Sequence, residues 1–205
     1  KECTGQNIFC PQLHCREHLN VNRWMNDLRA RDKDVGYAFD NKMISTWKSF
    51  TDDNRYANMD SFNYSSDSEI PGLKDIFKEG WMLFNQIFGY ASKSFIASCY
   101  IWGSEIEDAA LDVGIEYIQG DRYQLIPRKG EGPAGLRRKS HYIGQRNKND
   151  QIYLMRNCTF EPSWDQSADW VDRCLSQIST AFKWQKPATI STHRLNYIGY
   201  INEKN

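Results

Sequence analysis

The sequence has no excess of either charge. Its 26 Lys and Arg residues balance 26 Asp and Glu residues, so the formal net charge at pH 7 is zero. A protein without an overall positive field has no general attraction for nucleic acid or for an anionic membrane. We therefore expect no nucleic-acid partner and no membrane partner, and a neutral or small polar substrate fits the composition better.

Several other features are missing. The six cysteines include no Cys-x-x-Cys pair, which argues against a zinc ribbon or a dithiol redox site. Most of them are expected to be small buried apolar groups, and disulfides are neither required nor excluded. The glycine-rich loop of a nucleotide site is absent, as are a signal peptide and an apolar run long enough to span a bilayer. Because the first residue is Lys1, we expect the natural N-terminus to lie upstream, and a soluble location in the cytoplasm or the periplasm stays open.

The chain is long enough for one domain with a sizeable core, and nothing in it resembles a linker. Strand-like apolar runs alternate with helical stripes. The expected strands are residues 8–13, 93–98, 115–119, 151–158 and 188–192, and the expected helices are residues 17–28, 35–43, 68–88, 104–113 and 165–183. Residues 120–149 are expected to form a basic, irregular insertion. The alternation predicts an α/β protein with mainly parallel strands in a sheet or barrel.

Histidine is scarce, and two of the four histidines, His14 and His18, lie four residues apart beside Glu17. On a helix this spacing places both imidazoles on one face, where they can share a metal ion; the alternative is a hydrogen-bonded polar turn. His193 follows an expected strand, so all three histidines lie at strand ends, where α/β folds build their sites. His14 and His18 are candidate ligands of zinc, with cobalt, iron or nickel as alternatives, and His193 is a candidate acid or base.

Other polar and aromatic residues near strand ends are candidates for substrate binding, each with a structural alternative as a hydrogen-bond partner or a core residue. They are Arg16, Tyr100, Trp102, Arg156, Asn157 and Glu161. The basic cluster 137–139 is expected to be solvated, with contact to an anionic substrate as the alternative. His141 is expected to lie on the surface or to anchor its loop, and the adjacent carboxylates Asp52 and Asp53 are expected to form a solvated turn.

Four segments of the chain together resemble one family, the bacterial polysaccharide deacetylase-like proteins of the glycoside hydrolase and deacetylase superfamily. The segments are residues 12–21, 94–102, 156–163 and 190–197. The resemblance implies an irregular (β/α)7-type barrel over residues 1–205. It also implies a metal-dependent hydrolase that removes acetyl groups from a polysaccharide or an amino sugar. The family's histidine pair is matched by His14 and His18, and its late histidine at a strand end is matched by His193.

The chain departs from the family pattern at two places. An aspartate pair, one residue binding the metal and the other acting as base, should precede the histidine pair, yet only a short stretch stands before His14. Asp52 and Asp53 follow it in a loop, and the role is not carried onto them. Ile96 stands where the family has an arginine. We therefore expect the central part of a longer barrel, whose exposed strand edges favour self-association.

The same residues support several hypotheses. In the first, the intact protein is a carbohydrate deacetylase: His14 and His18 hold the metal with a carboxylate from outside this chain, and His193 protonates the leaving amine or alcohol. In the second, His-x-x-Glu-His is the inverted zinc-protease signature, in which Glu17 is the base that activates water. In the third, the barrel binds glycans without turnover. Whether this chain alone is active stays open.

Overall fold

The computed structural model describes residues 9–44, 58–132 and 135–198. The chain divides into two compact units, Lys1–Tyr153 and Leu154–Asn205, called unit 1 and unit 2 below. Within the described ranges, no helix is both long and apolar enough to cross a lipid bilayer.

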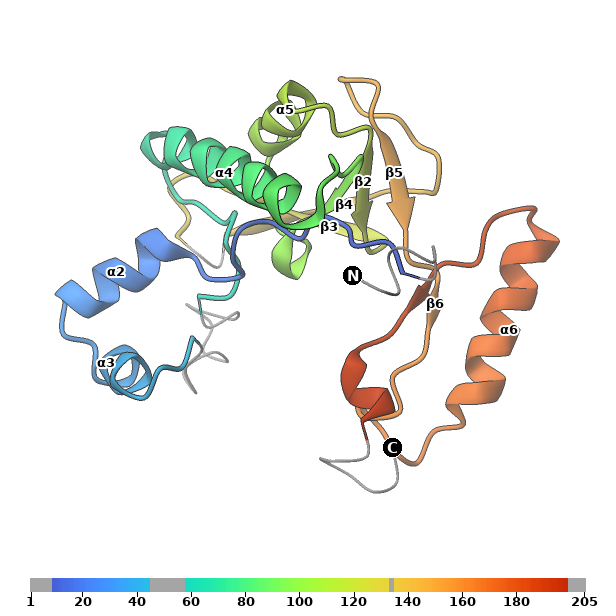
Figure 1. Cartoon of the computed structure of the whole chain (residues 1–205). Helices are drawn as coiled ribbons and strands as arrows, with labels where there is room; N and C mark the ends of the chain where they lie inside the picture. The colour runs from blue at the N-terminus through green and yellow to red at the C-terminus, as the bar shows by residue number, and fades with distance from the viewer. Residues whose placement is uncertain (1–8, 45–57, 133–134, 199–205) are drawn as a thin grey trace. The chain divides into compact units, whose positions relative to one another are not determined.

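The central sheet of the described chain has three strands, the last of which contains the boundary between the two units (Figure 1). They are β1 (Ser94–Ile96), β2 (Tyr117–Gly120) and β5 (Ile152–Met155), in the order β1-β2-β5. β1 and β2 run parallel, with Phe95 opposite Ile118. Leu13 forms a parallel bridge to Phe95, and the amide of Ile96 donates to the Leu13 carbonyl. Because this pairing is parallel, the residues that follow Leu13 and those that follow β1 leave the sheet at the same edge.

The longest helix is α4 (Ile70–Phe88), which confirms the helix predicted over residues 68–88. It continues from a 3₁₀ turn, Asp67–Glu69, where the Ser66 side chain completes a capping box. It ends at Gly89, whose φ of 76° is a left-handed conformation that glycine adopts without strain.

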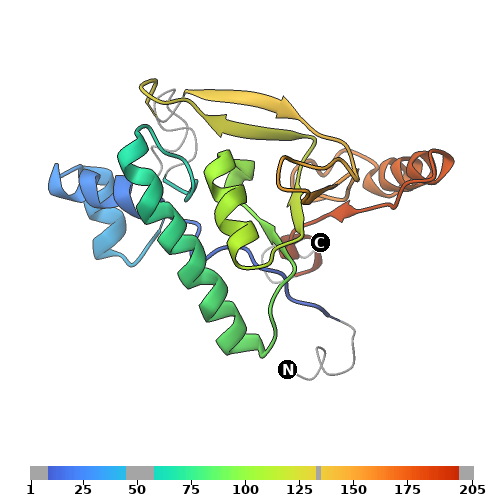
Figure 2. The ribbon, with the colours of Figure 1, turned by 90° about the horizontal axis from the view of Figure 1, so that it is seen from above.

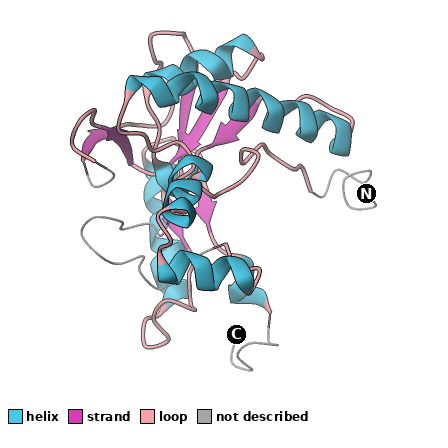
Figure 3. Cartoon of the chain, turned by 90° about the vertical axis from the view of Figure 1, so that its left-hand side faces the viewer, coloured by secondary structure: helices cyan, strands magenta, loops and turns pink. Residues whose placement is uncertain are grey.

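α4 and α5 (Ser104–Asp112) pack side by side against the sheet (Figure 3). The ring of Phe77 in α4 meets the ring of Phe95 edge to face, with centroids 5.0 Å apart. The 3₁₀ turn Ser98–Tyr100 connects β1 toward α5. The stripe of apolar residues in the sequence thus forms the core between helix and sheet, as its spacing predicts.

Two shorter helices precede the sheet. They are α2 (Val21–Arg29), whose N-cap is Asn20, and α3 (Lys33–Asp40), whose N-cap is Asp32. Each cap side chain accepts a hydrogen bond from a backbone amide in the first turn of its helix. The helices share a small apolar cluster, Trp24, Val35 and Ala38. The expectation that a helix already begins at residue 17 is wrong, because the cap lies at Asn20.

The expectation of an irregular insertion over residues 120–149 is also wrong. β3 (Tyr123–Pro127) and β4 (Leu136–Ser140) form an antiparallel pair in which Tyr123 stands opposite Ser140 (Figure 2). All of β4 after Leu136 is exposed, so it lacks the apolar alternation that marks a half-buried strand. Pairing with β3, rather than burial, holds it extended.

Over residues 156–198, unit 2 has one short parallel pair, one helix and one 3₁₀ turn. β6 (Cys158–Thr159) pairs with β7 (Ile190–Ser191), and α6 (Trp170–Lys183) connects them. α6 begins at Asp169, whose carboxylate accepts from the Asp172 amide, and it packs on β6. The 3₁₀ turn Arg194–Tyr197 directly follows His193.

The predicted (β/α)7-type barrel is wrong. Within the described residues, the strands form separate sheets of three, two and two strands. Barrel closure requires tilted strands that each pair with two neighbours, whereas β3 and β4 form a separate antiparallel pair, which a single bridge from Leu125 joins to Ile101, and β6 and β7 pair over two residues each. The parallel pairs β1–β2 and β6–β7 are what remains of the prediction. Self-association was predicted from the exposed edges of an incomplete barrel. Because the described strands form no barrel, that reason no longer applies, and self-association stays a prediction.

Candidate functional site

His14 and His18 are brought together by a turn. His14 directly follows the bridge residue Leu13, Cys15 has a left-handed φ of 66°, and the chain bends at Arg16 and again at His18. Residues 14–18 are not helical, and the predicted helix face is therefore wrong. The imidazoles nonetheless meet edge to face, with the two Nε2 atoms 2.8 Å apart.

The other nitrogen of each ring is fixed by a backbone carbonyl. His14 Nδ1 lies 2.9 Å from the Ile96 oxygen, and His18 Nδ1 lies 3.0 Å from the Met59 oxygen. A carbonyl oxygen only accepts, so each Nδ1 carries the proton and each Nε2 of a neutral ring presents a lone pair. Two lone pairs at 2.8 Å repel each other unless a cation, either a proton or a metal ion, is shared between them.

The histidine pair fits two ligand positions of a divalent metal. Metal–imidazole bonds are about 2.0–2.1 Å long, so one ion can lie within bonding distance of both Nε2 atoms. Hydrogen bonds from Nδ1 to carbonyls are the usual outer support of such ligands. Across the three described ranges, no group of three or more His, Cys, Asp or Glu side chains gathers around a common point. Asp52 and Asp53 lie outside the described residues.

Two thiols lie close to the pair. Cys15 Sγ donates to the Ile96 carbonyl and Cys99 Sγ donates to the Met59 carbonyl, the same two oxygens that hold the histidines. Burial raises the pKa of the Cys15 thiol, and burial raises the pKa of Cys99 to about 12. Because the thiolate is the form that ligates metals, these cysteines are poorly suited to complete the ligand set.

Arg16 and Glu17 are engaged with each other. The Arg16 guanidinium donates to both Glu17 oxygens, at 2.5 and 2.6 Å, and also to Glu79. The hydrogen bond from Arg16 to Glu17 is the main cause that raises the pKa of Arg16. A carboxylate held by a guanidinium on both oxygens is poorly placed to act as a base. The inverted protease motif also needs a helix through both histidines, and residues 14–18 do not form one.

The edge of the sheet beside the pair is conformationally strained. Cys99 and Tyr100 both have positive φ values, 54° and 57°, in the 3₁₀ turn that follows β1. Such values are uncommon outside glycine and concentrate at functional sites. Tyr100 is partly buried there, whereas Trp102 is fully buried and donates from Nε1 to Glu107. Trp102 is therefore a core residue and has no face available for stacking on a sugar.

Unit 2 contains a carboxylate–histidine pair. Glu161 is fully buried, and its two oxygens accept from His193 Nδ1 and from Asn196 Nδ2, each at 2.7 Å. The His193 side chain is 61% exposed. With Nδ1 committed to the carboxylate, Nε2 is the nitrogen that remains to exchange a proton. Glu161 thus orients the histidine instead of facing a substrate.

The remaining candidates of unit 2 make structural contacts. Asn157 donates to the Pro187 carbonyl and accepts from the Thr189 amide, which ties β6 to the approach of β7. Arg156 lies 3.4 Å from the Ser191 hydroxyl. Sequence reasoning did not select Asn196, the second partner of Glu161, because an isolated asparagine carries no pattern.

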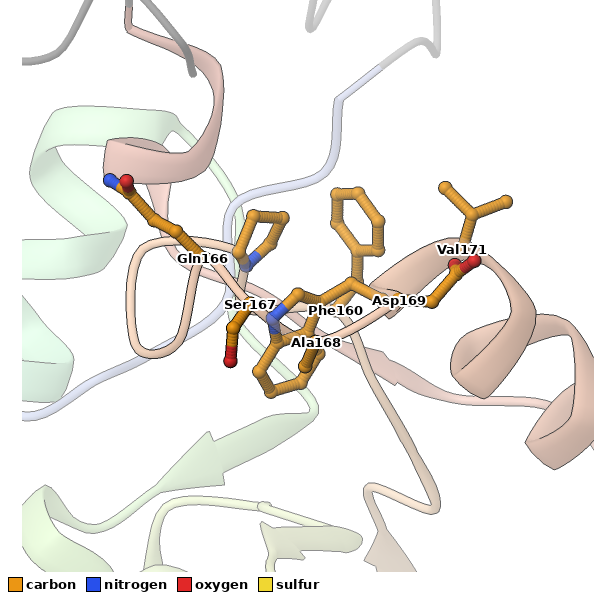
Figure 4. A pocket seen from close by; sticks show the side chains of 8 residues that line it. Phe160, Gln166, Ser167, Ala168, Asp169 and Val171 are labelled. Atoms are coloured by element: carbon orange, nitrogen blue, oxygen red, sulfur yellow. The ribbon is translucent and has the colours of Figure 1, made fainter.

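Trp164 was not selected either, although its ring centroid lies 6.2 Å from that of His193 and the residue is 67% exposed. A pocket of about 550 Å³ lies at the N-terminal end of α6 (Figure 4). The rings of Phe160 and Trp170 form part of its wall, with Asp169 beside them. None of the candidate residues from the sequence lines it, so this pocket is not built from the groups described above.

Comparisons of the chain with protein-family models, with curated proteins and with solved structures found no match.

Proposed function

We propose that the protein is a metal-dependent hydrolase that removes acetyl groups from a polysaccharide or an amino sugar. The observation that carries the proposal is the 2.8 Å approach of His14 Nε2 to His18 Nε2, with each Nδ1 facing a carbonyl oxygen. The resemblance of four segments to polysaccharide deacetylase-like proteins supports the same chemistry. We do not propose a protease, because Glu17 is held by Arg16 and its segment is not helical.

The residues of unit 1 would hold the cation through nitrogen ligands. His14 and His18 provide the two Nε2 atoms, and the carbonyls of Ile96 and Met59 keep the rings in the required tautomer and orientation. A divalent cation bound there would supply Lewis-acid chemistry, polarising an acyl carbonyl and making a water molecule more acidic. Zinc is the default because two imidazoles suit it.

Deacetylation also needs a proton for the departing amine or alcohol. The Glu161–His193 pair of unit 2 has the chemistry of such a donor, because the buried carboxylate fixes Nδ1–H and leaves Nε2 to deliver the proton. We therefore propose His193 as a proton donor within unit 2 and Glu161 as the residue that positions it.

Acetate release tests the proposal. The full chain with zinc is incubated at pH 7.5 with acetylated chitooligosaccharides or acetylated xylan, and acetate is measured in a coupled assay. We expect release by the wild type, loss of it to background in His14→Ala and His18→Ala, and a decrease of roughly 10²–10⁴-fold in His193→Ala. His141→Gln, which alters a histidine distant in sequence from both groups, should retain the rate.

Two results would contradict the hydrolase. One is binding of these glycans by the wild type without acetate release, which would favour the non-catalytic glycan-binding protein. The other is an undiminished rate in both His14→Ala and His18→Ala.

A further inference from the structure

Positive charge is concentrated on the β3–β4 ribbon of unit 1. Its exposed cationic residues are Arg122, Arg137, Arg138 and Lys139. Within the described part of the chain none of them forms an ion pair, whereas their neighbours Arg128 and Lys129 both have carboxylate partners. The chain as a whole has no net charge. The ribbon is therefore a local positive surface on an otherwise balanced protein.

The register of the ribbon places cations on both of its faces. Arg138 shares a face with Tyr123, and Arg137 and Lys139 lie on the other. The ring of the exposed Tyr123 has two guanidinium groups beside it, Arg122 at 5.4 Å and Arg138 at 5.8 Å from the ring centroid. Among the described strands, β4 pairs with β3 alone, so its outer edge is a sheet edge (Figure 2).

The carboxylate next to Arg122 in the sequence bonds to its backbone. Asp121 accepts from the Arg122 backbone amide, at 2.7 Å. The positive charge of Lys139 is felt further along the chain, where it is one of the causes, after burial, that lower the pKa of His141. The surface thus combines guanidinium groups that remain available to an anion with one exposed aromatic ring.

We propose that this ribbon binds an anionic polysaccharide whose sugars carry carboxylate groups. Guanidinium groups bind carboxylates through paired N–H donors, and the ring of Tyr123 holds two of them, those of Arg122 and Arg138, close together. An extended polymer lying along the open edge of β4 can reach Arg138 on one face and Arg137 and Lys139 on the other. Nucleic acid is a poorer match, because its binding proteins present broader basic surfaces. The inference rests on the proposed function for the choice of a carbohydrate, and it names the substrate class.

Polymer binding by a charge-matched pair of variants tests the proposal. The probes are polygalacturonate, neutral dextran and a single-stranded DNA oligonucleotide, titrated into the full chain at low and at moderate salt. One variant, Arg137→Gln with Arg138→Gln and Lys139→Gln, removes three charges from β4. The control, Arg31→Gln with Lys33→Gln and Lys42→Gln, removes three exposed charges from the α3 region of the same unit.

We expect salt-sensitive binding of polygalacturonate by the wild type and no binding of dextran. The β4 variant should bind at least about tenfold more weakly, because charge-assisted contacts are lost, and the control should bind like the wild type. Equal weakening in both variants would reduce the effect to net charge and overturn the proposal. Binding of DNA as tight as that of polygalacturonate would also overturn the proposal. Absence of polygalacturonate binding would overturn it as well, and the charges would then serve to prevent pairing of an exposed strand.

Zinc binding in the same samples separates this proposal from the proposed hydrolase. Loss of polymer binding in the β4 variant, with zinc binding intact, would support polymer binding by the ribbon and would leave the proposed metal site of the histidine pair unaffected. Polymer binding without any zinc binding would support the proposal for the ribbon and contradict the proposed hydrolase.

Discussion

At the scale of single residues, the chemistry open to each histidine depends on which of its two ring nitrogens carries the proton. His14 and His18 are held by carbonyl oxygens at Nδ1, which leaves both Nε2 atoms to a cation. His193 is held at Nδ1 by the buried Glu161, which leaves Nε2 to exchange a proton. In both cases the group that accepts from Nδ1 fixes the tautomer and leaves Nε2 as the second nitrogen of the ring, and we propose a metal-binding role for the first two histidines and a proton-donor role for the third.

Replacing Glu161 tests the positioning role. We expect Glu161→Gln to lower acetate release about 10–100-fold, because an amide holds Nδ1–H less firmly, while zinc binding stays unchanged. The double variant with His193→Ala should be no slower than His193→Ala alone, since Glu161 acts through His193. A wild-type rate in Glu161→Gln, or a further decrease in the double variant, would show that Glu161 does not act in this way.

His141 gives a pH-dependent contribution to stability. Burial lowers its pKa, so the unfolded chain takes up a proton at a higher pH than the folded one. As the pH falls below about 6.5 the unfolded state binds more protons, and the free energy of unfolding decreases. Urea unfolding at pH 7.5 and at pH 5.5 should show a smaller decrease in His141→Gln than in the wild type. Equal decreases in the two proteins would contradict this explanation.

At the scale of elements, α4 supports the segment that carries the histidine pair. A Cβ atom at Gly80 would lie 2.7 Å from the Arg16 backbone nitrogen, between His14 and His18 in the chain. We expect Gly80→Ala to lower the free energy of unfolding by about 1–3 kcal/mol and to weaken zinc binding, because the Arg16 backbone must move.

Gly72→Ala is the matched control on the same helix. Nothing lies within 4 Å of a Cβ atom there, so alanine should stabilise the protein by up to about 1 kcal/mol through helix propensity. Chemical unfolding and a zinc titration of both variants check the pair. If Gly80→Ala behaved like Gly72→Ala, the close packing of α4 on Arg16 would not matter to the site.

Helices were predictable where an apolar stripe and caps occur together. α4 has both, whereas β4 has neither an apolar alternation nor a buried face, and its register depends on β3. The histidine pair was predicted by its spacing, but through a helix. The turn at Cys15, with a φ of 66°, is set by tertiary contacts rather than by a sequence pattern.

At the scale of the whole molecule, the alternation of strands and helices predicts mainly parallel strands in a sheet or barrel, and the barrel that the family resemblance implies is wrong. Alternation is a local property, whereas closure depends on which distant strands pair; among the described strands, β1–β2 and β6–β7 are parallel pairs of the expected kind. Glu161 and His193 were both candidates from the sequence, but nothing in their spacing indicated that one would be buried beneath the other.

A calorimetric zinc titration of the full chain at pH 7.5 decides whether His14 and His18 bind a metal ion. We predict a single saturable site in the wild type and in His141→Gln, and no such site in His14→Ala or His18→Ala. Absence of zinc binding by the wild type, or full binding by both single variants, would contradict this prediction.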